Sequence, residues 1–135
     1  MVVLRFAFIE RLWGAEPECD SLDTHNSVVK IISDDSNNAL VNYAVNNSSS
    51  VAAMVSNTNT DAEKLAIWEK ARQGAVYRLD DTILTNSRNR ATRAVTCSGL
   101  LYVTVGDTIA QKQVDFKVER TTDGKMSVSV DPFLF

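Results

Sequence analysis

The sequence predicts an α+β fold in which N-terminal helices pack on a curved, four-stranded antiparallel meander. Two observations predict it. Residues 75–130 contain four strand-like runs separated by three short turn sequences, which is the pattern of consecutive hairpins. Residues 19–74 instead place apolar side chains three or four positions apart. With 135 residues, 44% of them hydrophobic, the chain can form one core, so we expect residues 19–135 to be a single domain.

The last two strand-like runs are the most regular. Residues 114–119 and 125–130 alternate apolar side chains with charged or serine side chains, as expected for strands with one buried face. Gly124 lies between these runs and Gly106 precedes them, and both glycines predict tight turns. The sequence therefore predicts that the chain closes with an antiparallel hairpin.

The first two strand-like runs are less regular. Residues 95–105 are apolar at alternate positions, and Leu100 and Tyr102 interrupt the polar side. A strand that is apolar on both faces usually lies at the centre of a sheet, and Gly99 within it indicates a bulge or bend. Residues 77–83 form the first run, which has the weakest alternation.

The helical half has one well-defined helix and one ambiguous region. Residues 22–44 predict either two helices, the first ending near Ser33 and the second starting near Asn37, or one long weak helix. Residues 46–60 predict a loop or a short helix. The next helix starts at Thr60 or Asp61 and is closed by Gly74. The side chains expected to face the sheet from this last helix are Leu65, Ile67, Trp68 and Ala71.

Residues 1–18 form a separate N-terminal segment. The segment is apolar and carries an early positive charge, as export signals do, but Arg5, Glu10 and Arg11 interrupt its apolar run. We therefore expect either an amphipathic helix or the remnant of a signal peptide.

The two cysteines, Cys19 and Cys97, are predicted to form a disulfide. The bond would close a loop of about 80 residues and join the helical half to the sheet. The alternative is two buried thiols in a cytosolic protein. A disulfide indicates an oxidising compartment, here the periplasm or the cell exterior, whereas reduced cysteines would indicate the cytoplasm.

Composition excludes several classes of function. The net charge of −3 argues against a nucleic-acid partner, and no apolar stretch is long enough to span a bilayer. One histidine, two cysteines and five glycines provide neither a zinc site nor a phosphate-binding loop, so we expect no metal and no cofactor. His25 acting as a base for a Cys97 nucleophile is disfavoured because a cysteine inside a strand is normally packed or bonded.

A cluster of arginines is the one charged feature that suggests a binding site. Arg88, Arg90 and Arg93 lie in and after the first predicted hairpin, and with Arg78 they form a local basic patch on an acidic protein. Such charges commonly keep a hairpin tip soluble. The functional interpretation is a docking site for an acidic partner or an anion.

The order of these features resembles a known group of domains. Cys19, a helix, a polar loop, a second helix, a strand carrying Cys97 and the closing hairpin VDFKVERTTDGKMSVSV are similar to small exported bacterial domains of cystatin-like or NTF2-like fold, over residues 19–131. NTF2-like enzymes hold a histidine and a carboxylate inside the cone of sheet and helices, and no such pair is evident here. The resemblance therefore implies an assembly module, such as a periplasmic part of a secretion machine.

We accordingly expect a non-enzymatic interaction domain whose partner is another protein or a second copy of the chain. The apolar terminus Phe133-Leu134-Phe135 either tucks into the sheet or forms part of an interface. One alternative is a small-ligand binder or degenerate enzyme. Another is an inhibitor or immunity protein. The residues expected to line a ligand pocket are Trp68, Tyr77, Tyr102 and Phe116.

Overall fold

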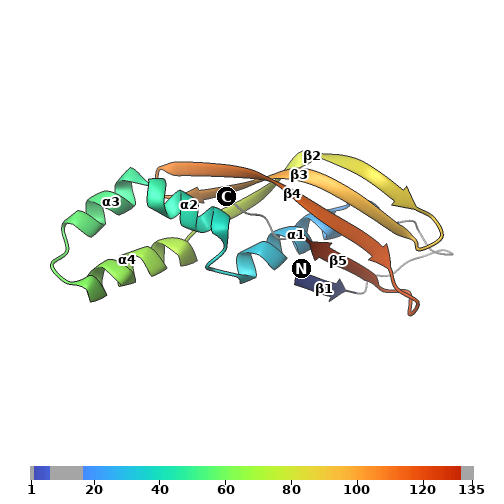
Figure 1. Ribbon diagram of the computed structural model, residues 1–135, viewed down its shortest axis with the longest axis horizontal. Coiled ribbons are helices and arrows are strands. Elements are labelled where there is room, and N and C mark those ends of the chain that lie inside the picture. Colours follow the sequence, from blue (N-terminus) through green and yellow to red (C-terminus); the bar gives the residue numbers. More distant parts are fainter. Residues whose placement is uncertain (1, 7–16, 132–135) are drawn as a thin grey trace.

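The computed structural model describes residues 2–6 and 17–131. In chain order, four helices follow the first strand and precede the other four strands (Figure 1). The elements in chain order are β1 (Val2–Phe6), α1 (Leu22–Asp34), α2 (Ala39–Asn47), α3 (Ser49–Ser56), α4 (Asp61–Gln73), β2 (Val76–Asn89), β3 (Ala94–Val105), β4 (Thr108–Arg120) and β5 (Met126–Val130).

The sheet confirms the predicted meander and adds a strand to it. Strands β2, β3, β4 and β5 pair antiparallel in sequence order. Strand β1 then pairs antiparallel with β5, so the sheet order is β1-β5-β4-β3-β2. The expected amphipathic helix is therefore wrong for residues 2–6, which are held by backbone pairing with the last strand. Residues 7–16 and the apolar terminus Phe133-Leu134-Phe135 lie outside the described part of the chain.

The core lies between one face of this sheet and helices α1 and α2. Helix α2 packs on β3 and β4, whereas α1 contacts β5 and β2, which are separated by two strands in the sheet. One helix can touch both only because the sheet curves around it, as Figure 1 shows. Alternate residues of β3 and β4 face the helices, and Phe116 is the largest fully buried side chain among them.

Strand β2 is irregular because it contains two bulges. The register with β3 shifts between Leu79 and Ile83 and again between Thr85 and Ser87. Gly99 of β3 lies at the first shift, where a Cβ atom would come within 2.7 Å of the Ile83 Cδ1 atom. The bulge predicted at Gly99 therefore exists, but its extra residues belong to β2, and the glycine leaves space for their side chains.

Each helix begins at a polar cap, which settles the ambiguous region. The side chains of Ser21, Asn38, Ser48 and Thr60 accept hydrogen bonds from the first turns of the four helices. Residues 22–47 therefore form two helices and not one. Asn38 also fixes the second helix to the sheet, because its side-chain nitrogen donates to the Tyr77 hydroxyl at 2.8 Å.

Helices α3 and α4 form one end of the elongated molecule and do not cover the sheet (Figure 1). Helix α4 packs against α2 and α3. The predicted buried face of α4 is confirmed only in part: Ile67, Trp68 and Ala71 are partly buried against the core, but no residue of the helix is fully buried and Leu65 is 59% exposed. Trp68 is only partly buried and packs at the edge of the core, so it is not the principal contact with the sheet that its helical spacing predicts.

Two turn glycines give a matched test of this architecture. Gly106 and Gly124 both have positive φ, at 55° and 82°. A Cβ atom on Gly106 would clash with the Ser50 hydroxyl, whereas one on Gly124 would meet nothing within 4 Å. Gly124→Ala should therefore cost about 1 kcal/mol from backbone strain, and Gly106→Ala roughly 2–3 kcal/mol. Urea unfolding measures both, and equal losses would contradict the close contact between α3 and the β3–β4 turn.

Candidate functional site

Cys19 and Cys97 form a disulfide, as the sequence predicted. The Cα atoms are 5.8 Å apart, and the residues are separated by 78 positions. Both cysteines are buried, and Cys97 lies opposite Phe116 in the β3–β4 ladder. The bond ties the segment before α1 to the centre of the sheet. It also removes Cys97 as a nucleophile for His25, because its sulfur has no free thiolate.

The predicted arginine cluster is spread over different environments. Arg88 donates from Nη1 to the Pro17 carbonyl at 3.0 Å, which anchors the segment next to the disulfide. Arg90 is exposed at the tip of the β2–β3 hairpin. Arg93, with a positive φ of 54°, lines a shallow hollow of about 580 Å³ between this tip and the β4–β5 turn, which Arg120 also lines.

Arg78 does not belong to this cluster. It lies in β2 opposite Tyr102, and its guanidinium stacks on the Tyr102 ring 4.5 Å from the centroid. Arg88 follows ten positions further along β2, and two bulges lie between the two arginines. This contact is a cation–π pair on the sheet face that points away from the helices, where it covers a partly exposed aromatic ring.

The four aromatic residues predicted to line one pocket do not come together. Phe116 lies on the sheet face that the helices cover, and Tyr102 lies on the opposite face. Tyr77 lies beside α1, and Trp68 lies between α4 and the helices next to it. The reason is the alternation of side chains along paired strands, which places Tyr102 and Phe116 on opposite faces.

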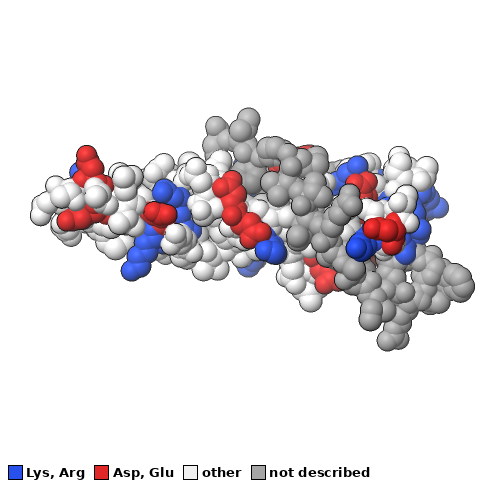
Figure 2. Space-filling view, turned by 90° about the horizontal axis from the view of Figure 1, so that it is seen from below, with Lys and Arg blue, Asp and Glu red and all other residues white. Residues whose placement is uncertain are grey.

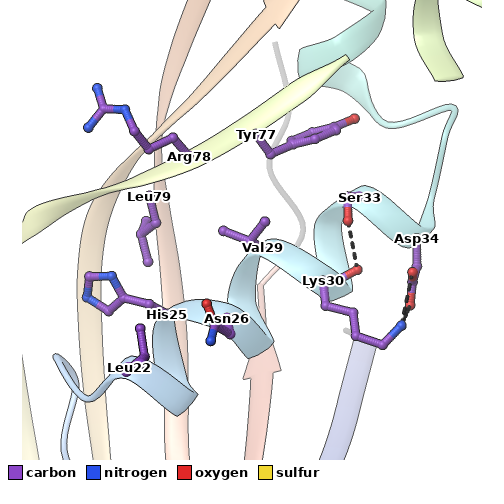
Figure 3. A pocket seen from close by; sticks show the side chains of 10 residues that line it. All are labelled: Leu22, His25, Asn26, Val29, Lys30, Ser33, Asp34, Tyr77, Arg78 and Leu79. Carbon is purple, nitrogen blue, oxygen red and sulfur yellow. Dashed lines mark hydrogen bonds and ion pairs between the residues drawn. The ribbon is translucent and has the colours of Figure 1, made fainter. Parts of the chain in front are cut away.

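A hollow lies between α1 and β2 (Figure 3). Its volume is about 590 Å³, and it is open along one side. Val29 and Leu79 form apolar parts of its wall, while Leu22 stands at its edge with 74% of its surface exposed. Burial raises the pKa of Tyr77 at its far end, although the hydrogen bond from Asn38 acts in the other direction.

His25 is the only histidine of the chain, and it lies in this hollow without a catalytic partner. Its Nε2 atom is buried and has no hydrogen-bond partner. The carboxylate that lines the same hollow, Asp34, is at the other end of α1 and accepts a hydrogen bond from Lys30 at 3.0 Å (Figure 3). Asp34 follows His25 by nine helical positions, or about 13 Å along the axis. The arrangement can hold a small group, but it does not assemble an acid–base pair.

Helices α3 and α4 each expose one large apolar side chain. Met54 of α3 is 50% exposed and Leu65 of α4 is 59% exposed. Between these helices and α2 lies a groove of about 330 Å³, whose apolar lining includes Val51, Val55 and Trp68. We call the exposed apolar side chains Met54 and Leu65, together with Trp68, the α3–α4 surface.

The α3–α4 surface is held in place by Asp107 in the β3–β4 turn. Its Oδ1 atom accepts hydrogen bonds from the Ser48 hydroxyl at 2.8 Å and from the Ser50 backbone at 3.3 Å. These bonds lower the pKa of Asp107, the one from Ser48 most strongly. The turn thus fixes the first residues of α3, and the helix pair projects from a defined point on the sheet.

The exposure of this surface is not evident from the sequence. Leu65 and Trp68 have helical spacing, which favoured a buried face, but the helix also carries charged residues all round. Seven charged or polar residues among the thirteen of α4 leave too narrow an apolar stripe for a helix that covers a sheet. That narrow stripe was the feature that could have indicated a helix at the rim of the core.

Comparison with known proteins gives no further information on the site: no family model, curated protein or solved structure matches the chain. Within residues 2–6 and 17–131, no three potential metal-ligating side chains lie together. No helix in this part of the chain is long and apolar enough to cross a membrane.

Proposed function

We propose that this chain is a non-enzymatic protein–protein interaction or assembly domain, and that α3–α4 is its contact surface. The observation that carries the proposal is the exposure of α4. This helix is 13 residues long, contains a tryptophan and a leucine, and has no buried residue. A partner is the simplest source of the missing burial.

The physical argument concerns what keeps such a helix folded. Isolated helices of about 12–15 residues are marginal in water, and most helices in proteins are stabilised by packing of an apolar face. Helix α4 has good caps, with the Thr60 hydroxyl accepting from the Glu63 amide at 3.1 Å and acids and bases at the favourable ends. Its own packing is limited to the partly buried Ile67, Trp68 and Ala71, so Leu65 remains available to a partner. Trp and Arg, which α4 contains at positions 68 and 72, are enriched among residues that dominate binding energy.

We further propose that the domain works in the periplasm or outside the cell. The Cys19–Cys97 disulfide supports this location, because such bonds persist in oxidising compartments. A sheet that curves around α1 also supports kinship with cystatin-like or NTF2-like exported domains, among which non-catalytic assembly modules occur. The proposed location is tested by determining whether the Cys19–Cys97 bond is present in protein from the native source.

The interaction is tested by capture of partners with tagged protein. Met54→Glu/Leu65→Glu places two charges on the α3–α4 surface, and we expect it to lose the bound partner while its melting temperature changes little. The matched control is Leu22→Glu, which charges a leucine on α1 that is even more exposed than Leu65 and should retain the partner. Loss by both variants, or by neither, would contradict the assignment of the surface. An inhibitor or immunity protein would give the same pattern, with an enzyme as the captured partner.

A small-ligand binder is the second candidate, and the buried His25 Nε2 atom favours it. A ligand in the α1–β2 hollow could supply the missing hydrogen bond. Binding of carboxylate or phosphate compounds would shift the imidazole resonances of His25 in an NMR titration. Unchanged resonances across such a panel would remove this candidate and leave the interaction domain.

A further inference from the structure

We infer that the partner of α4 is the α4 of a second copy of this chain, packed antiparallel to form a two-fold dimer. This inference rests on the proposed function, because it identifies the occupant of the same surface. A homodimer contact of this kind uses one patch twice, so the patch must be complementary to itself.

The sequence of α4 has this self-complementarity. Its first turn is acidic, with Asp61 and Glu63, and its last turn is basic, with Lys70 and Arg72. A two-fold axis that passes between positions 66 and 67 places residue 61 opposite 72, 63 opposite 70, and 65 opposite 68. Asp61 of each copy is then level with Arg72 of the other, and Leu65 is level with Trp68.

Four of these residues share one side of the helix, whereas Glu63 and Lys70 lie on the opposite side. Asp61, Leu65, Trp68 and Arg72 are separated by steps of four, three and four, which is the spacing of a helix-pairing seam. In an antiparallel pair, Asp61 of one copy meets Arg72 of the other at both ends, and the two Leu65–Trp68 contacts fill the middle. A parallel pair would bring Asp61 beside Asp61 and Arg72 beside Arg72, so like charges select against it.

The structure leaves this seam accessible. Asp61 is exposed, Leu65 is 59% exposed, and Trp68 and Arg72 are partly covered. Within the described residues, neither Asp61 nor Arg72 makes an ion pair with its own chain. Figure 2 shows acidic side chains at the left-hand tip of the molecule and basic ones beside them toward the middle, over the end formed by α3 and α4. Because α4 lies at that end of the molecule, a second copy can approach from there and place its own α4 alongside.

The expected affinity follows from the size of the contact. A helix of 13 residues is about 20 Å long, so the pair buries less than the roughly 1,200 Å² of a standard stable interface. We therefore expect a dissociation constant on the order of 10–100 µM, which rises with salt because the end contacts are exposed ion pairs.

Charge exchange tests the geometry on the full-length, oxidised chain. Analytical ultracentrifugation from about 1 µM to 1 mM should show a monomer–dimer equilibrium for the wild type. Asp61→Arg places a second guanidinium against Arg72 of the other copy, and Arg72→Asp puts two acids together, so each variant alone should dimerise at least about tenfold more weakly. In a mixture of the two variants, each mixed pair has opposite charges at both ends, because one copy carries Arg at positions 61 and 72 and the other carries Asp at both. The mixture should therefore regain the wild-type dimer affinity, and so should the double variant D61R/R72D, whose pairs also have opposite charges at both ends.

The double variant also controls for misfolding, since an unfolded chain could not regain the dimer. Wild-type protein that stays monomeric at 1 mM, or a dimer that neither single charge reversal weakens, would overturn the inference. A third outcome separates the two proposals. If the wild type is monomeric but captures a different protein, and Met54→Glu/Leu65→Glu abolishes that capture, self-pairing is refuted and the proposed function stands.

Discussion

Replacing both Cys19 and Cys97 with alanine should lower the free energy of unfolding by about 4–5 kcal/mol. The bond joins residues 78 positions apart, and chain-entropy models assign a loss of this size to opening such a loop in the unfolded state. Domains of this size have total stabilities of about 5–15 kcal/mol, so the variant should be near the limit of folding at 37 °C. Urea unfolding monitored by Trp fluorescence measures the difference.

Reduction of the native chain provides the control for this prediction. Wild-type protein treated with a thiol reductant should gain the mass of two hydrogens and lose about the same stability as the variant. The alanine variant should not respond to the reductant at all. A wild type whose mass and unfolding midpoint do not change under complete reduction would show that the bond is absent, and the argument for an oxidising compartment would fail with it.

Phe116→Ala should cost about 4 kcal/mol, the second largest effect expected. The phenyl ring is 2% exposed and is the largest fully buried side chain of the core. It lies opposite Cys97 on one neighbouring strand and Val130 on the other, under the face on which α2 packs. Removing it loses the transfer free energy of the ring and leaves a cavity between rigid strands, which together cost about 3–5 kcal/mol in other cores.

Two neighbouring changes make the Phe116 prediction specific. Phe116→Leu retains most of the volume and should cost about 1 kcal/mol. Ile109→Ala removes an apolar side chain from the same strand, but Ile109 is 68% exposed, so we expect a loss of no more than about 0.5 kcal/mol. Equal losses for Phe116→Ala and Ile109→Ala would contradict the assignment of the inner face of β4.

The strands and hairpins could be predicted from the sequence because their determinants are local. The alternation in residues 114–118, the turn at Gly124 and the caps of the helices each depend on a few neighbouring residues. The pairing of β1 with β5 could not be predicted in this way, since every pair in its register joins residues about 120 or more positions apart in the sequence. A strand whose partner lies at the other end of the chain has no local pattern that distinguishes it from an amphipathic helix.

The candidate site was less predictable than the fold because it depends on which faces are covered. Trp68 and Leu65 have the spacing of a buried helix face, but only the packing of α4 on α2 and α3 shows that Leu65 remains exposed. Tyr102 and Phe116 were grouped by residue type, and the strand register places them on opposite faces. The disulfide was accessible from the sequence because the chain contains only two cysteines.

Hydrogen exchange of the α4 amides tests most directly the central claim that this helix is completed by the α4 of a second copy. At about 1 µM the helix should exchange rapidly through local opening, because little of its own chain covers it. At about 1 mM we expect protection of residues 61–73 to rise about tenfold, since a ligand that binds the folded helix at about ten times its dissociation constant stabilises it by that factor. Leu65→Glu should hold the helix at the dilute level at every concentration. Exchange that is slow in dilute solution, or that does not change with concentration in the wild type, would contradict the account.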